Sequence, residues 1–110
     1  MFEKYSNLIM NSLTVLIDFN SNLLIKSNLS KNDKTATLDS IHLAYSIQIK
    51  ICTRNFDFSL QAMNLILIAL SFFLKTDIIE PAQIEDAKKL ERYITEKINK
   101  IYSEEFIPFE

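Results

Sequence analysis

The side chains that most often do chemistry in small proteins are few in this chain. Its 110 residues include one histidine, His42, and one cysteine, Cys52. The two are ten residues apart, which places them on different faces of a helix and disfavours a catalytic pair or a shared metal ion. A lone cysteine also excludes an intrachain disulfide and a multi-cysteine metal site. We therefore expect His42 to lie half-buried beside Ile41 and Tyr45, with no chemical role.

Asp18 is the other candidate for chemistry, because a buried lone carboxylate often marks a functional site. At helical spacing it falls away from the apolar Leu13, Leu16 and Leu23, so we expect it to be exposed to solvent. The chain also contains no glycine. Phosphate-cradling loops and dinucleotide-binding turns need glycine where the backbone approaches a ligand closely. The sequence therefore predicts a protein that is not an enzyme and that holds no cofactor or metal.

Charge and hydropathy restrict the partners. The chain has 14 acidic and 12 basic residues, and basic residues are interspersed with acidic ones, as in residues 85–92. Because phosphate neutralisation needs clustered Lys and Arg, we expect no nucleic acid partner. The longest clean apolar run, residues 62–74, is shorter than the roughly 20 residues of a membrane span. No signal peptide is visible, so we expect a cytoplasmic protein with no direct membrane insertion, from a low-GC bacterium or its phage.

Short polar segments divide the chain into four stretches. Within each stretch apolar residues recur every three or four positions, which is the spacing of amphipathic helices. The helices are expected over residues 2–26, 35–54, 58–75 and 81–102 of a single domain, 1–110. The first of them has its apolar, core-facing positions at Tyr5, Ile9, Leu13, Leu16, Phe19 and Leu23. Where the backbone needs positive φ, Asn28 and Asn55 are the candidates. Because the connections are short, we expect an all-α, antiparallel up-down four-helix bundle, with the tail 103–110 packed back on it.

The second stretch is ambiguous. Residues 45–51 alternate between apolar and polar side chains, which is the period of a half-buried strand. No other stretch alternates well enough to pair with it, and an unpaired strand leaves its backbone groups unsatisfied. We therefore predict a helix that buries Leu38, Ile41, Tyr45 and Cys52 on one side.

The third helix is apolar except for a narrow polar sector formed by Gln61, Asn64, Ser71 and Lys75. This pattern predicts a helix that is buried on most of its surface. Ile68 falls inside the polar sector. It is either an ordinary exposed isoleucine or part of a contact surface.

Residues 69–81 (ALSFFLKTDIIEP) combine an apolar helix ending in paired aromatics, a short polar turn, Ile-Ile and a proline that opens a charged helix. This stretch, together with the chain length, the four helices and the aromatic tail, resembles the immunity proteins of class IIa (pediocin-like) bacteriocins. Within that family, the pattern is similar to that of the carnobacteriocin B2 immunity type. The resemblance covers the chain from about Leu38 to the C-terminus, while many members of that family are basic and this chain is acidic.

The resemblance implies an antimicrobial-resistance protein that protects its producer cell from the cytosol. Such proteins bind the mannose phosphotransferase permease, a membrane receptor, once the bacteriocin has engaged it. In that family, the C-terminal half of the chain recognises the partner. We expect this chain to be a monomer. With Ile68, the residues expected to bind the partner are Lys75, Asp77, Ile78, Ile79, Phe106, Ile107 and Phe109.

Three alternatives remain open on the sequence. The chain could be a phage- or plasmid-encoded inhibitor that blocks a host defence complex by protein–protein binding. It could instead be a dimerisation bundle in which the sector around Ile68 is the subunit interface. The aromatic side chains of the tail, finally, could simply cover the open end of the core.

Overall fold

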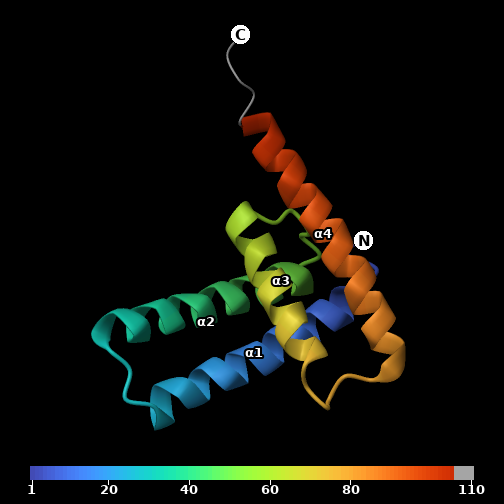
Figure 1. The fold of residues 1–110 in the computed structure, drawn as a ribbon. Coiled ribbons are helices and arrows are strands. Elements are labelled where there is room, and N and C mark those ends of the chain that lie inside the picture. The colour runs from blue at the N-terminus through green and yellow to red at the C-terminus, as the bar shows by residue number, and fades with distance from the viewer. Residues whose placement is uncertain (106–110) are drawn as a thin grey trace.

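The computed structural model describes residues 1–105 and contains four α-helices in this part of the chain (Figure 1). They are α1 (Ser6–Lys26), α2 (Lys31–Cys52), α3 (Leu60–Leu74) and α4 (Pro81–Glu105). No strand occurs in the described residues, so the all-α class is confirmed. The strand alternative for residues 45–51 is excluded, because these residues lie inside α2.

Local hydrogen bonds explain where the helices begin. The Ser30 hydroxyl accepts a hydrogen bond from the Asp33 N–H at 3.2 Å, and the Ser59 hydroxyl accepts one from the Ala62 N–H at 3.1 Å. Both are N-cap contacts, typically worth about 1 kcal/mol. The cap at Ser30 starts α2 four residues earlier than residue 35, the start predicted from the sequence. Pro81 begins α4 as expected, since its missing N–H has no partner at that position.

The end of α2 uses an unexpected residue. Among the described residues, the only positive φ belongs to Arg54, at 58°, and not to Asn28 or Asn55. The Asn55 N–H donates to the Lys50 carbonyl at 2.8 Å, and the Arg54 N–H donates to the Ile51 carbonyl at 3.0 Å. This pair of bonds is a Schellman motif, which requires a left-handed residue just after the helix.

Helices α1 and α3 contribute most of the core, and α2 and α4 supply four buried apolar residues each. Within α1, Ile9, Leu13 and Leu16 are buried as the spacing predicts, and Leu8 and Ile17 are buried in addition. The predicted core residue Phe19 is instead 44% exposed. Asp18 is exposed, which confirms that expectation. The buried residues of α4 follow the predicted 3.6-residue period: Ala87, Leu90, Ile94 and Ile98.

The core face of α2 differs from the predicted one. Ile41, Ala44, Ile47 and Ile51 are buried, whereas the predicted core residues Leu38, Tyr45 and Cys52 are exposed. The alternation of residues 45–51 arises because the helix is apolar on two nearly opposite faces. Ile47 and Ile51 lie on the buried face, and Tyr45 and Ile49 lie on the other.

The helices share one core and pack in neighbouring pairs: α1 contacts α2 and α3, and α3 also contacts α2 and α4. Figure 1 shows α1 and α2 as one hairpin, with α3 crossing it and α4 lying on the far side of α3. These contacts are those of a helical bundle. The finer antiparallel up-down order stays a prediction.

An aromatic cluster at the N-terminus helps to hold α4. The Phe2 ring is 5% exposed and lies edge-on to the rings of Phe58 and Tyr93, with centroid distances of 4.9 and 5.5 Å. The Lys97 ammonium lies 5.4 Å from the Phe2 ring centroid. Edge-to-face pairs add about 0.5–1.5 kcal/mol beyond the apolar area that they bury. Phe2 therefore joins the N-terminus, the segment before α3 and α4.

The free end of the α1–α2 hairpin contains no buried residue. The last buried residue of α1 is Ile17 and the first of α2 is Ile41, so residues 18–40 contain none. In Figure 1 this end projects away from α3 and α4. It is stabilised mainly by the contact between two helices.

Candidate functional site

The exposed sector of α3 is the first part of the candidate site. Seven residues of this helix are buried: Ala62, Met63, Leu65, Ile66, Ala69, Leu70 and Phe73. The opposite side includes Gln61, Asn64 and Ile68, which are exposed as the sequence pattern predicts. Ile68 is 56% exposed. A large apolar side chain is thus presented to solvent on a helix that is otherwise mostly buried.

Ile68 lines a hollow between α3 and α4. Helix α3 and its C-cap provide Leu67, Ile68, Ser71, Phe72 and Lys75, and α4 provides Glu91 and Thr95. We call this hollow the α3–α4 groove. Leu67, Ile68 and Phe72 make its α3 side apolar, and Lys75 and Glu91 add one charge of each sign. An apolar groove with a few charged groups suits an apolar segment of a protein partner, because the charges fix its orientation.

Phe19 extends this apolar surface onto α1. Its ring centroid lies 4.8 Å from that of Phe72, with an interplanar angle of 47°. Phe19 is 44% exposed, so the pair is partly open to solvent. The sequence pattern placed Phe19 in the core, and its position next to the groove was therefore missed.

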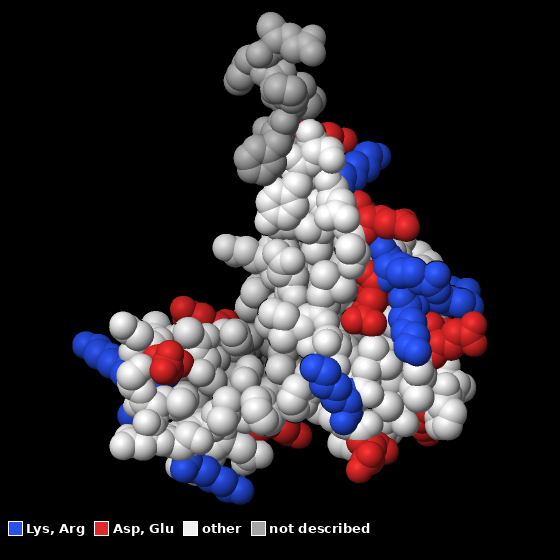
Figure 2. All heavy atoms as spheres, viewed as in Figure 1, with Lys and Arg blue, Asp and Glu red and all other residues white. Residues whose placement is uncertain are grey.

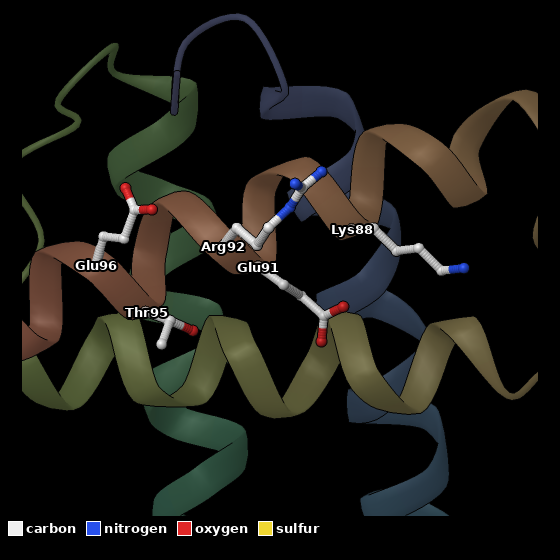
Figure 3. Close-up of a pocket in the computed structure, with 5 residues that line it drawn as sticks. All are labelled: Lys88, Glu91, Arg92, Thr95 and Glu96. Carbon is white, nitrogen blue, oxygen red and sulfur yellow. The ribbon is translucent and has the colours of Figure 1, made fainter.

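The α4 side of the groove continues into a charged helix surface. Lys88, Glu91, Arg92, Thr95 and Glu96 surround a shallow hollow on α4 (Figure 3). In that view Glu91 and Thr95 point toward α3, whereas Arg92 and Glu96 point away from it. Because all five residues come from one helix, this hollow is an open surface rather than an enclosed pocket.

The charges on α4 are mixed in sign. Figure 2 shows basic and acidic side chains interleaved along the side of the molecule that α4 forms. Glu85 and Lys89 form an ion pair at 3.7 Å, with side chains 78% and 49% exposed. Exposed pairs of this kind contribute at most about 1 kcal/mol. This surface offers no continuous positive field for a polyanion.

The residues predicted to bind a partner lie in two places. Ile68 and Lys75 line the α3–α4 groove. Asp77 and Ile78 are exposed in the connection between α3 and α4, and Ile78 is 68% exposed. Ile78 contributes to a different hollow, which is lined by Asn11, Thr14, Val15, Phe73, Glu80 and Gln83.

The other predicted residues are not all surface groups. Ile79 is partly buried and packs against the core, so it holds the α3–α4 connection in place rather than presenting a free surface. Phe106, Ile107 and Phe109, with the predicted packing of the tail, lie outside the described residues. The predicted boundary between the last helix and the tail was residue 102, whereas α4 continues to Glu105.

His42 and Cys52 are both exposed on α2. The expectation that His42 is half-buried was wrong, because the buried face of α2 is centred on Ala44 and not on Tyr45. Within residues 1–105, no group of three or more His, Cys, Asp or Glu side chains lies close enough to hold a metal ion.

Helix α1 is long and apolar enough to cross a membrane, judged by length and composition. A third of its apolar window is buried inside the protein. Asn7, Asn11, Thr14 and Asp18 form an exposed polar stripe along the same helix. Such a stripe is typical of an amphipathic helix that packs in a bundle.

Comparisons with protein-family models, with curated proteins and with solved structures found no match to this chain.

Proposed function

We propose that this protein is a bacteriocin immunity protein that binds the complex of a class IIa bacteriocin with its membrane receptor, the mannose phosphotransferase permease. Binding takes place from the cytosolic side and protects the producer cell. The observation that carries this proposal is the α3–α4 groove, which Ile68, 56% exposed, lines together with the charged residues Lys75 and Glu91.

The position of the groove supports the proposal. The stretch that resembles the immunity proteins, residues 69–81, forms the end of α3, the connection to α4 and the first residue of α4. Phe72 and Lys75 from this stretch line the groove, and Ile78 is exposed in the connection. The sequence likeness and the exposed apolar surface therefore coincide at one end of α3.

The groove favours recognition rather than catalysis. Its lining consists of apolar side chains, two hydroxyls and one charge of each sign. In the proposed mode, an apolar segment of the receptor complex packs against Leu67, Ile68 and Phe72, and Lys75 and Glu91 select its orientation. Asp77 and Ile78, which are exposed in the α3–α4 connection, make a second contact. The resemblance adds Phe106, Ile107 and Phe109 as further candidates for partner binding. The proposal includes the antiparallel up-down order of the immunity bundle, which the three short connections between the helices favour.

The proposal predicts that one charge placed in the groove removes most of the protection. The experiment expresses the wild type, Ile68→Glu and Ile25→Glu in a strain that is sensitive to class IIa bacteriocins, and measures the minimal inhibitory concentration of several such bacteriocins. Ile25 is the matched control, because it is 79% exposed on α1 and lies outside the groove. Central apolar interface residues are typically worth about 2 kcal/mol or more, which corresponds to a roughly 30-fold change in affinity.

We expect the wild type and Ile25→Glu to raise the inhibitory concentration of at least one bacteriocin, and Ile68→Glu to lose most of that gain. Immunoblotting should show equal amounts of the three proteins. If the wild type protects against none of the bacteriocins, the immunity function is refuted and the phage- or plasmid-encoded inhibitor becomes the better hypothesis. If Ile68→Glu protects as well as the wild type, the groove is not the recognition surface.

A further inference from the structure

Helix α2 has a second apolar face that the protein's own core leaves uncovered. Its members follow steps of four, three, four and three residues: Leu38, His42, Tyr45, Ile49 and Cys52. We call this set the α2 stripe. All five residues are exposed, with 44% for Leu38, 50% for Tyr45 and 65% for Ile49. The stripe is about 21 Å long at 1.5 Å per residue.

The neighbouring helix does not cover the stripe. Helix α1 meets α2 on the side of Gln48, whose side-chain amide donates to the Met10 carbonyl at 3.2 Å and to the Thr14 hydroxyl at 3.0 Å. The contacts of α2 with α3 occupy its buried face. A helix that is apolar on two faces, with only one of them packed inside its own domain, presents the other to a partner.

The spacing of the stripe indicates what that partner is. Steps of three and four residues are the pattern of a coiled-coil seam, in which side chains of one helix pack between the equally spaced side chains of another. The stripe contains no Lys, Arg, Asp or Glu, so an identical stripe can face it without charge repulsion. From these observations we propose that α2 pairs with α2 of a second copy of this chain, in a two-fold symmetric dimer.

The size of the stripe determines the expected affinity. The exposed parts of Leu38, Tyr45 and Ile49, together with His42, Cys52 and the residues beside them, offer on the order of 500 Å² of accessible surface for burial on each chain. The total is near the lower limit of a specific interface, about 1,000–1,200 Å². The dimer should therefore be weak, with a Kd of about 10–100 µM. The sequence led us to expect a monomer. The proposal replaces this expectation with a protein that is monomeric at low concentration and dimerises as its concentration rises.

The test is sedimentation equilibrium of the purified protein at loading concentrations from the low micromolar to the millimolar range. It compares the wild type, Ile49→Glu, Ile68→Glu and Ile78→Glu. Each substitution places a charge at an exposed isoleucine, but only Ile49 belongs to the α2 stripe. Circular dichroism before each run checks that the helical content is unchanged.

We expect the wild type, Ile68→Glu and Ile78→Glu to dimerise with the same Kd. Ile49→Glu should weaken the dimer at least about 50-fold, because symmetry places two like charges in one interface. A wild type that stays monomeric at millimolar concentration overturns the proposal. A dimer that persists in Ile49→Glu also overturns the proposal. A dimer that Ile68→Glu dissociates overturns it as well, because the interface would then lie on α3. The outcome is independent of bacteriocin protection, because the assay contains only this protein.

Discussion

At the scale of single residues, the left-handed conformation of Arg54 is the clearest departure from what the sequence predicts. A chain without glycine must place another residue after α2, and arginine has a Cβ atom that makes this conformation unfavourable by about 1–2 kcal/mol. Arg54 also forms an ion pair with Glu3 at 3.3 Å, but both side chains are largely exposed, at 77% and 66%. Such a pair offsets only part of the backbone cost.

Replacing Arg54 by glycine should therefore stabilise the protein. We expect Arg54→Gly to raise the free energy of unfolding by about 0.5–1 kcal/mol. Glycine removes the unfavourable energy of the left-handed backbone, and this gain exceeds two destabilising effects: the loss of the ion pair and the larger conformational entropy of the unfolded chain. Arg54→Ala is the matched control, since it removes the ion pair and keeps the Cβ atom. Urea unfolding measures both variants. If Arg54→Gly is no more stable than Arg54→Ala, the positive φ carries no strain.

Side-chain placement shows how far the sequence could predict the candidate site. Ile68 was identified because it falls in the polar sector of α3, and Lys75 because of the resemblance to the immunity proteins; both line the groove. Phe19 and Glu91 were missed, since their contribution depends on how α1 and α4 approach α3. The spacing within one helix gives the face on which a residue lies. It does not reveal which neighbouring helix covers that face.

At the scale of the helices, α2 illustrates the same limit. The start of α3 follows from the cap at Ser59 and the start of α4 from Pro81, whereas α1 begins at Ser6, four residues later than predicted, without a side-chain cap. In α2 two apolar stripes compete, and the sequence favoured the one with the larger side chains, Leu38 and Tyr45. The structure buries the stripe that contains Ala44 instead, because a small residue there lets neighbouring helices approach closely.

The α1–α2 hairpin should differ in local stability along its length. Residues 18–40 contain no buried side chain, whereas Ile9 and Leu13 of α1 and Ile47 of α2 are at most 1% exposed. Regions with few buried apolar contacts open at low free energy. We expect amide hydrogens of residues 21–26 and 34–40 to exchange much faster, at least about 100-fold, than those near Leu13 and Ile47. Native-state hydrogen exchange followed by NMR measures this difference, and uniform protection along both helices would contradict it.

At the scale of the whole molecule, three surfaces with different chemistry surround one apolar core. The α3–α4 groove is apolar with a charge of each sign, the outer side of α4 is charged with both signs, and the α2 stripe is apolar without formal charge. The all-α class and the single core were predictable from composition and periodicity. The positions of these three surfaces were not predictable from the sequence, because they depend on which helix faces remain uncovered after the helices pack.

The central claim is that the groove around Ile68 recognises the receptor complex, and co-purification tests it most directly. An affinity-tagged chain is expressed in a sensitive strain, the cells are treated or not with a class IIa bacteriocin, and detergent-solubilised membranes are passed over the affinity resin. We predict that subunits of the mannose phosphotransferase permease bind with the wild type and with Ile25→Glu only after bacteriocin treatment, and fail to bind with Ile68→Glu. Absence of the permease from every wild-type eluate, or equal recovery with Ile68→Glu, would contradict the account.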